Sequence, residues 1–317
     1  MSHIYIYSPS SAVRDKAAFR RGVARLKALG HEVEVDEAAL STHQRFAGDD
    51  ETRLAAIGRA AASAADVALI SRGGYGLTRI LAGLPYKPLA KAIERGTQFV
   101  GLSDFTALQC AVLAKTGAVT WAGPALGEDF GAEAGPDEIM EACFDDLICG
   151  HGEGSGWRLP AGDLPALTAL LLQQGKTVAE DGPELRVRKA TLWGGNLTVL
   201  CALVGTPYLP ALKGGILFLE DVNEHPYRIE RQLTQLLHAG ILGQQKAVLL
   251  GSFNRFQVSP HDRGFKLQTV VNWLRSQTRT PVFTGLPFGH VPTKVLLPVG
   301  QQVELMVQGR DALLYWG

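Results

Sequence analysis

Three residues of the kinds that make a catalytic triad each follow an apolar, strand-like run of the chain. Ser103 follows "FVGL", Glu220 follows "ILFL", and His290 lies in a glycine- and proline-containing loop after "PVFT". A serine hydroxyl becomes a nucleophile when a histidine takes its proton, and a carboxylate orients that histidine. The order serine, acid, histidine also occurs in α/β-hydrolases, although Ser103 lacks their G-x-S-x-G motif. These residue types predict nucleophilic catalysis at the ends of strands.

Two of these residues also have a simple structural interpretation. Serine is a common N-cap, because its hydroxyl accepts a hydrogen bond from a free N–H group at a helix start, and propensity alone favours this role for Ser103. A single loop histidine such as His290 is usually just exposed, although a loop at a strand end is also where a scaffold presents a base. Glu220 differs, since an ionisable side chain that closes an apolar strand needs a partner or a function.

The charged segment after Glu220 predicts the start of a helix rather than a metal site. Pro226 fits the first turn of that helix. Glu224 and His225 are adjacent, but no HExxH motif or carboxylate cluster accompanies them, so we predict no metal. We expect a solvated helix start with charge pairs three and four residues apart, formed by Asp221, Glu224, Arg228 and Arg231.

Two glycine turns follow strand-like runs. Residues 71–76 ("SRGGYG") lie between a strand and a helix and offer backbone N–H groups to an anion. They match neither GxGxxG nor GxxxxGK[ST], so the support for nucleotide binding is weak. An oxyanion hole uses the same kind of backbone donors. The second turn, residues 193–196 ("WGGN"), either approaches a ligand or packs against a neighbour, and the sequence leaves both interpretations open.

The elements that position these residues alternate in the first half of the chain. Strand-like runs such as "HIYIY", "HEVEV" and "VALI" alternate with helix-like runs such as "RDKAAFRRGVARLKALG". This rhythm predicts an α/β fold with a parallel sheet covered by helices on both faces and functional groups at the carboxyl ends of the strands. From about residue 131 glycine and proline are frequent, and the second half is richer in strands and ends in a β-hairpin pattern. We predict an N-terminal α/β domain over residues 1–145, a linker over 146–165 and a β-rich C-terminal domain over 166–317.

Charge and composition argue against several partners. The 31 Lys and Arg residues balance the 31 Asp and Glu residues, so no net field attracts nucleic acid or an anionic membrane. No apolar stretch reaches the roughly 18 residues of a membrane span, and the N-terminus lacks the pattern of a secretory signal. We expect a cytoplasmic protein with no nucleic-acid or membrane partner. Its four cysteines should stay reduced, with Cys110 and Cys201 in the core.

Five motifs together resemble the L,D-carboxypeptidase family, the muramoyltetrapeptide carboxypeptidases: "RGGYG", "GLSDFTAL", "TLWGGNL", "LEDVNEHPYRIER" and "GLPFGH". The resemblance runs in order through nearly the whole chain. It implies an N-terminal domain like class I glutamine amidotransferases and a C-terminal domain of the swivelling β/β/α type. It also implies a serine peptidase that removes the terminal D-Ala from murein tetrapeptides during cytoplasmic cell-wall recycling. Such enzymes are homodimers and need no metal or other cofactor.

The resemblance also implies roles for particular residues. Ser103 in "GLSDF" is the nucleophile, His290 in "FGH" is the base, and Glu220 in "LED" is the orienting acid. The backbone amides of Gly73 and Asp104 form the oxyanion hole.

Three further residues are candidates for substrate binding, namely Arg72, Gly74 and Asn196. Arg72 directly precedes Gly73, and its guanidinium suits the carboxylate of a terminal D-Ala. The alternative for Arg72 is an ion pair with a structural carboxylate that orders the glycine turn.

Two other functions remain open at this point. Self-immunity hydrolases of a neighbouring branch of the family cleave peptide–nucleotide antibiotics and share the triad. A non-catalytic α/β module could instead bind an anion at "RGGYG". Covalent labelling of Ser103 by a serine-directed phosphonate would exclude the second of these.

Overall fold

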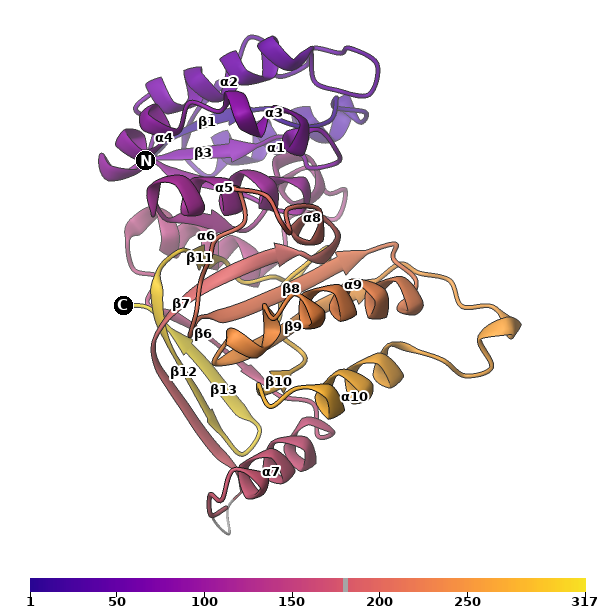
Figure 1. Ribbon diagram of the computed structural model, residues 1–317. Helices are drawn as coiled ribbons and strands as arrows, with labels where there is room; N and C mark the ends of the chain where they lie inside the picture. Colours follow the sequence, from indigo (N-terminus) through magenta and orange to yellow (C-terminus); the bar gives the residue numbers. More distant parts are fainter. Residues whose placement is uncertain (179–181) are drawn as a thin grey trace. The chain divides into compact units, whose positions relative to one another are not determined.

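The computed structural model describes residues 1–178 and 182–317, and the chain forms two compact units (Figure 1). Unit 1 contains Met1–Gly152 with the short segments Gly205–Pro210 and Pro292–Gly300. Unit 2 contains Glu153–Val204, Ala211–Val291 and Gln301–Gly317. The chain is therefore a mixed α/β protein of two parts, as the alternating pattern of the sequence predicts.

The strands of unit 1 form one sheet with the order β11-β5-β4-β3-β1-β2. They are β1 (His3–Tyr7), β2 (Glu32–Val35), β3 (Val67–Ile70), β4 (Gln98–Gly101), β5 (Thr120–Ala122) and β11 (Leu297–Val299). Strands β1 to β5 pair in parallel, and β11 joins β5 in the antiparallel direction. The predicted parallel sheet is confirmed. Its central strand β3 is buried along its whole length, as its continuous apolar sequence requires.

The helices of unit 1 lie on two faces of this sheet. They are α1 (Lys16–Ala28), α2 (Asp50–Ala62), α3 (Leu77–Ile80), η1 (Leu81–Gly83), α4 (Tyr86–Glu94), η2 (Ser103–Phe105), α5 (Thr106–Thr116), the π-helix η3 (Leu126–Phe130) and α6 (Glu138–Cys149). The chain runs from β1 to β2 in one direction along the sheet, and from β2 to β5 in the other. Right-handed crossovers then place α1 on one face and α2, α4 and α5 on the other. The contacts agree, because α4 packs against α2 and α5, whereas α1 packs against η3.

This reversal of direction has a functional meaning. It occurs between the neighbouring strands β1 and β3. In open α/β sheets, ligands bind outside the carboxyl ends of the strands at such a switch point. The loops that follow β1 and β3 are therefore the part of unit 1 where a ligand is expected.

Short polar side chains define where the helices of unit 1 begin. Asp15 accepts a hydrogen bond from Ala18 N at 2.8 Å and so caps α1, and Asp49 accepts one from Thr52 N at 2.8 Å and caps α2. Gly117 ends α5 in the left-handed conformation. These local signals explain why the helices were readable from the sequence.

Unit 2 has a sheet with the order β10-β9-β8-β7-β12-β13-β6. The strands are β6 (Gly154–Arg158), β7 (Glu184–Asn196), β8 (Ile216–Val222), β9 (Ala247–Asn254), β10 (Val282–Phe283), β12 (Gln302–Gln308) and β13 (Asp311–Tyr315). Strands β7 to β10 pair in parallel, while β7, β12, β13 and β6 pair antiparallel. The predicted closing hairpin is confirmed as β12 and β13.

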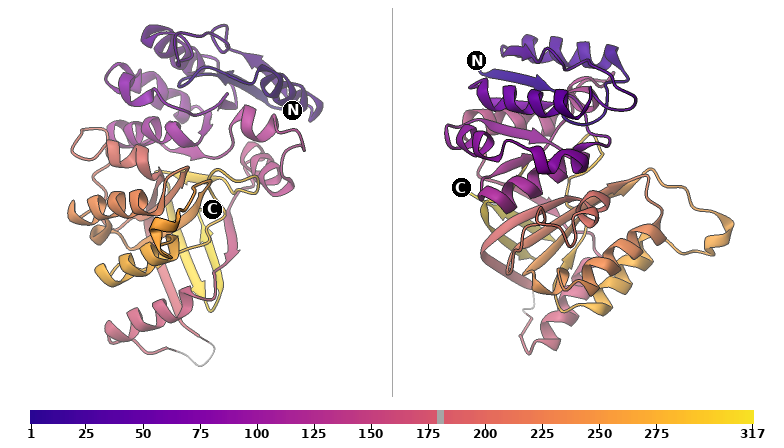
Figure 2. Two further views of the ribbon diagram at one scale, coloured as in Figure 1. Left: turned by 90° about the vertical axis from the view of Figure 1, so that its right-hand side faces the viewer. Right: turned by 45° about the horizontal axis from the view of Figure 1, so that its top comes forward.

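Helices accompany the parallel half of this sheet. They are α7 (Asp163–Gln173), α8 (Leu197–Ala202), α9 (Pro226–His238), η4 (Leu242–Gln244), η5 (Pro260–Asp262) and α10 (Leu267–Gln277). Helices α9 and α10 contact each other and lie side by side in both views of Figure 2. Pro226 stands at the first turn of α9, as predicted.

The glycine turn predicted at residues 193–196 is not a turn but the end of a strand, and packing explains its glycines. These residues lie within β7, where Gly194 pairs with Phe218 of β8. Gly194 has a φ of 137°, and a Cβ there would lie 1.9 Å from the carbonyl oxygen of Phe218. Only glycine lets the two backbones come this close.

The linker expected over residues 146–165 is not a loop. Helix α6 continues to Cys149, Gly154–Arg158 forms β6, and α7 begins at Asp163. Glycine-rich sequence was misleading here, because β6 is an edge strand that the neighbouring strand β13 holds through backbone pairing. The predicted C-terminal domain also includes residues 179–181, which lie outside the described residues.

The cysteines lie as their sequence contexts predict. All four cysteines are free, and Cys110 and Cys201 are buried. Within residues 1–178 and 182–317, no helix is long and apolar enough to cross a membrane.

Candidate active site

Ser103 lies on a strained turn between β4 and α5 and opens the short helix η2. Its φ is 65°, a left-handed conformation that costs a non-glycine residue roughly 1–2 kcal/mol. The N-caps of η2 and α5 are Leu102 and Phe105, and no side chain caps either helix. The capping interpretation of Ser103 is therefore wrong. Backbone strain at a strand-to-helix turn is typical of serine nucleophiles, whose hydroxyl it presents to the substrate.

The glycine turn after β3 packs directly against Ser103. A Cβ on Gly73 would lie 2.7 Å from Ser103 Cβ and 2.9 Å from its Oγ, so a side chain has no room there. Gly74 has a φ of 109°, and a Cβ on it would lie 2.3 Å from Ser11 Oγ. The fold thus brings the backbone of Gly73 next to the serine, and it explains Gly74 by its contact with Ser11.

Asp104, the residue after the serine, ties this turn to two neighbouring loops. Its side chain is buried, and Oδ2 accepts hydrogen bonds from Ser10 Oγ at 2.8 Å and from Leu77 N at 2.9 Å. Burial raises the pKa of the Asp104 carboxyl, although these hydrogen bonds oppose the shift. No local pattern predicts this side-chain role, because Ser10 and Leu77 are distant from Asp104 along the chain.

Replacing Asp104 by alanine is expected to lower the free energy of unfolding by about 2 to 5 kcal/mol, because two buried donors lose their acceptor. Asp104→Asn keeps an oxygen at this place and should lose less. Urea unfolding of the two variants and the wild type measures the difference. Equal stability of Asp104→Ala and the wild type would contradict the role.

Arg72 precedes Gly73 at the end of β3 and is half-buried. Its Nη1 donates a hydrogen bond to the carbonyl oxygen of Ala12 at 3.0 Å. No carboxylate of the described residues lies within ion-pair distance of Arg72, so the structural ion pair considered for it is not found there. Burial lowers the pKa of the Arg72 guanidinium, while Glu128 opposes this shift and Arg14 and Arg45 add to it.

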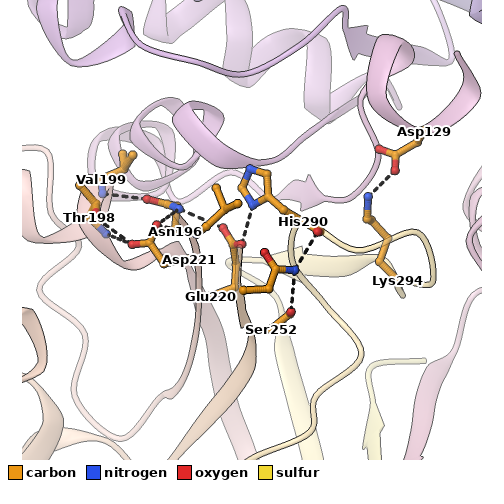
Figure 3. A network of polar contacts seen from close by, with 11 residues as sticks. Asp129, Asn196, Thr198, Val199, Glu220, Asp221, Ser252, His290 and Lys294 are labelled. Atoms are coloured by element: carbon orange, nitrogen blue, oxygen red, sulfur yellow. Dashed lines mark hydrogen bonds and ion pairs between the residues drawn. The ribbon is translucent and has the colours of Figure 1, made fainter. Parts of the chain in front are cut away.

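In unit 2, His290 and Glu220 form a buried pair (Figure 3). His290 Nδ1 lies 2.8 Å from Glu220 Oε2, and the side chains are 6% and 0% exposed, respectively. A carboxylate can only accept, so an Nδ1–H group donates to it, and in the neutral form of this ring Nε2 is the basic nitrogen. This is the arrangement that prepares a histidine to take a proton from a serine.

Glu220 lies inside β8 rather than at its end. The strand continues to Val222, and its register with β9 shifts between Leu219 and Asp221. Such a bulge re-aims a side chain relative to its neighbours. The sequence prediction placed Glu220 correctly near the carboxyl end of the strand but ended the strand too early, because the polar pair Glu220 and Asp221 looked like a strand end.

Asn196 holds the carboxylates of this site in place. Its Nδ2 donates to Glu220 Oε1 at 3.2 Å and to Asp221 Oδ1 at 3.0 Å, and its Oδ1 accepts from Val199 N at 3.1 Å (Figure 3). Asn196 is therefore the N-cap of α8 and a support of Glu220. These contacts give Asn196 a structural role, and its contact with substrate stays a prediction.

Asp221 is buried, which corrects the expectation of a solvated helix start. Its Oδ2 accepts hydrogen bonds from the N–H and hydroxyl groups of Thr198 at 2.9 Å and 2.8 Å. Burial raises the pKa of the Asp221 carboxyl, and the neighbouring Glu220 charge raises it further against the effect of Thr198. The expected pair Glu224–Arg228 is present at 3.6 Å on the exposed start of α9.

The loop that carries His290 is fastened to β9. Ser252 N donates to the carbonyl oxygen of Phe288 at 2.8 Å. Asn254 Nδ2 donates to the carbonyl oxygen of His290 at 3.0 Å and to Ser252 Oγ at 3.1 Å. The backbone of His290 is thus fixed independently of its bond to Glu220.

A second buried ion pair follows His290 along the chain. Lys294 Nζ contacts Asp129 Oδ1, and both side chains are 3% exposed (Figure 3). Thr293 Oγ1 donates to Asp137 Oδ2 at 2.6 Å. Both contacts lie within unit 1 and hold the segment Pro292–Gly300 beside η3 and α6. Sequence reasoning missed them, because no local pattern marks a lysine as buried.

Metal ligation finds no support in the described part of the chain. Among residues 1–178 and 182–317, no group of three or more His, Cys, Asp or Glu side chains could hold a metal ion. His225, considered above with Glu224, instead caps α9 and lies 3.2 Å from Asp262 Oδ2.

A serine on a strained turn and a histidine bound to a carboxylate are the groups of a serine hydrolase. Residues 4–123 match the model of the LD-carboxypeptidase N-terminal domain, and residues 189–305 match that of the LD-carboxypeptidase C-terminal domain. A Streptomyces coelicolor protein named as a carboxypeptidase is 33% identical to this chain over 310 residues. The matched region covers 96% of this chain and 90% of the relative. The chain belongs to the LD-carboxypeptidase family.

Solved structures extend the comparison. The muramoyltetrapeptide carboxypeptidase of Oxalobacter formigenes is 38% identical, with a TM-score of 0.82, over 99% of this chain and 98% of that one. The microcin C7 self-immunity protein in complex with aspartyl sulfamoyl adenosine has a TM-score of 0.81 at 21% identity, over 99% and 96% of the chains. The second match shows a shared fold.

Proposed function

We propose that this protein is a serine L,D-carboxypeptidase that removes the terminal D-Ala from murein tetrapeptides. The bond cleaved joins the L-centre of the third residue, diaminopimelate or lysine, to D-Ala. The observation that carries the proposal is the buried His290–Glu220 pair, with Nδ1 and Oε2 2.8 Å apart. The substrate comes from the similarity to the muramoyltetrapeptide carboxypeptidase of Oxalobacter formigenes.

In this proposal Ser103, His290 and Glu220 act as one triad. Ser103 belongs to unit 1 and the other two residues to unit 2, so the reaction needs both parts of the chain. His290 Nε2 takes the proton of the Ser103 hydroxyl as its Oγ attacks the carbonyl carbon. Glu220 fixes the tautomer of the imidazole and stabilises the imidazolium that forms. The imidazolium then protonates the leaving amine of D-Ala.

The oxyanion is held by backbone N–H groups. We assign this role to Gly73, which packs against Ser103, and to Asp104, which follows it. Each such donor contributes about 3 kcal/mol to the stabilisation of the transition state. Water then attacks the acyl-enzyme, with His290 again as the base, and releases the shortened peptide.

Arg72 is our candidate for reading the free carboxylate of the terminal D-Ala. It stands next to Gly73, and a half-buried guanidinium without a carboxylate partner in the described residues can form two parallel hydrogen bonds with such a group. The carboxylate of D-Ala is only a few bonds from the attacked carbonyl. The arrangement makes the enzyme an exopeptidase.

A tetrapeptide whose terminal carboxylate is amidated tests this role. The wild type should cleave the free acid at least about tenfold faster, since a charge-assisted hydrogen bond is worth about 1.5–3 kcal/mol, and Arg72→Leu should lose the preference. The ratio of kcat/KM values for the two substrates measures it. Equal cleavage by the wild type would contradict the exopeptidase reading, and a preference kept in Arg72→Leu would move the role to another residue.

Mass spectrometry of a murein tetrapeptide incubated with the purified protein tests the function itself. The expected product is the tripeptide, formed with loss of D-Ala. An aminoacyl-sulfamoyl adenosine in a parallel reaction tests the alternative of a self-immunity hydrolase, which the fold shared with the microcin C7 protein motivates. Cleavage of the sulfamoyl compound alone would replace the proposed substrate, and no labelling of Ser103 by a phosphonate would favour a non-catalytic module.

The remaining expectations belong to this proposal. They are a cytoplasmic place in peptidoglycan recycling, a homodimer, and no cofactor. They also include the likeness of unit 1 to class I glutamine amidotransferases and of unit 2 to swivelling β/β/α domains. Light scattering of the purified protein checks the dimer.

A further inference from the structure

Unit 1 contains a pocket of about 240 Å³ that the proposed reaction does not fully use. It is lined by residues from the loop after β1 and the start of α1, from the end of β3, and from η3. It therefore lies at the switch point between β1 and β3, where open α/β sheets bind their ligands. Arg72 lines it, and the next residue, Gly73, packs against Ser103.

The walls of the pocket carry charges of both signs. Arg14 and Arg72 supply positive charge, while Asp15 and Glu128 supply negative charge. Asp15 is occupied as the N-cap of α1. The polar lining is balanced, so it suits a ligand without net charge that carries one group of each sign.

Arg72 and Glu128 both line this pocket, Arg72 half-buried and Glu128 exposed. They influence each other electrostatically, yet no ion pair joins them among the described residues. Arg72 donates one hydrogen bond to Ala12 O and keeps further N–H donors. Two opposite charges that face a cavity without pairing can each bind the complementary group of one ligand.

Three apolar residues, Val13, Ala18 and Phe19, form another part of the wall, and the last two are buried. Ser71 and Gly127 complete the lining. A pocket of this volume exceeds what a single methyl group fills, so it also accommodates a short aliphatic chain. Apolar surface beside two opposite charges that do not pair with each other suits the head group of an α-amino acid with a short aliphatic stem.

We infer that this pocket binds a free α-amino-acid head group, with its carboxylate on Arg72 and its ammonium on Glu128. The inference rests on the proposed function for its two possible sources. One is D-alanine, whose nitrogen becomes an amine when the peptide bond breaks. The other is the free end of a diaminopimelate side chain, which carries the same two groups and an aliphatic stem, whereas a lysine side chain carries only the ammonium. With this second source, another residue must read the carboxylate of the terminal D-Ala.

Isothermal titration calorimetry of the purified full chain tests the inference without any hydrolysis. The probes are D-alanine and meso-diaminopimelate, with D-alaninamide and propionate as analogues that keep one of the two charges. At least one zwitterion should bind. The single-charge analogues should bind at least about tenfold more weakly, as loss of one charge-assisted hydrogen bond predicts. Arg72→Leu and Glu128→Gln should each lower the affinity for the zwitterion by a similar factor. Glu94→Gln, an exposed charge on α4 outside the pocket, should change nothing.

The two sources are separated by the same measurements. Tighter binding of D-alanine, with equal hydrolysis of tetrapeptides that contain diaminopimelate or lysine, assigns the pocket to the leaving residue. Tighter binding of meso-diaminopimelate, with faster hydrolysis of its tetrapeptide, assigns it to the third residue. No zwitterion binding at millimolar concentration, or equal binding of the single-charge analogues, overturns the inference. Zwitterion binding without hydrolysis of any tetrapeptide overturns the proposed function but supports the inference that the pocket binds an amino-acid head group.

Discussion

Ser103→Ala and His290→Ala should each lower kcat for tetrapeptide hydrolysis on the order of 10⁴-fold or more while the protein stays folded. The reason is that the nucleophile and the base of a triad act as one unit, so removal of either stops the same step. Ser103 makes no capping hydrogen bond, so its hydroxyl contributes little to stability. Steady-state kinetics, with circular dichroism as the check on folding, measures the effect.

The double variant provides the decisive control for this prediction. Ser103→Ala with His290→Ala should be about as inactive as either single variant. Glu220→Ala should keep more activity than the other two, because an orienting group matters less than the base it orients. Effects that multiply in the double variant would contradict a shared triad.

Gly73→Ala should lower kcat on the order of 10²-fold or more, with a smaller change in stability. The new Cβ would lie 2.7 Å from Ser103 Cβ and 2.9 Å from its Oγ, so the serine or the glycine turn must move. A displacement of this kind misplaces the nucleophile and the proposed oxyanion donor together, and either effect alone costs about 10²-fold. The measurement is kcat and KM of the variant, with its thermal midpoint.

Gly58→Ala is the matched control for this substitution. Gly58 lies within α2, and a Cβ on it meets nothing within 4 Å. This variant should keep full activity and gain roughly 0.5–1 kcal/mol of stability, because alanine favours a helix over glycine. Full activity of Gly73→Ala would show that the turn does not position the nucleophile.

The sequence by itself determined the local structure and the chemical candidates. Periodicity, acidic N-caps such as Asp15 and the glycine that ends α5 depend on residues a few positions apart, so they are readable along the chain. The same holds for the parallel sheet of unit 1, since alternating strands and helices leave few other topologies. The motifs around Ser103, Glu220 and His290 identified the family for a similar reason, because each is contiguous.

Only the tertiary structure decided which of two roles a side chain takes. Ser103 could be a cap or a strained residue, and its φ of 65° depends on how β4, η2 and the Gly73 turn pack together. Asn196 and Asp221 looked available for ligand or solvent, yet the pairing of β7 with β8 buries them around Glu220.

Contacts between distant residues had no signal in the sequence at all. Lys294 and Asp129 are 165 positions apart, and their pairing follows from the return of the chain to unit 1 as β11. The free energy of such a contact comes from burial that both partners share, and burial is a property of the folded arrangement rather than of either local segment.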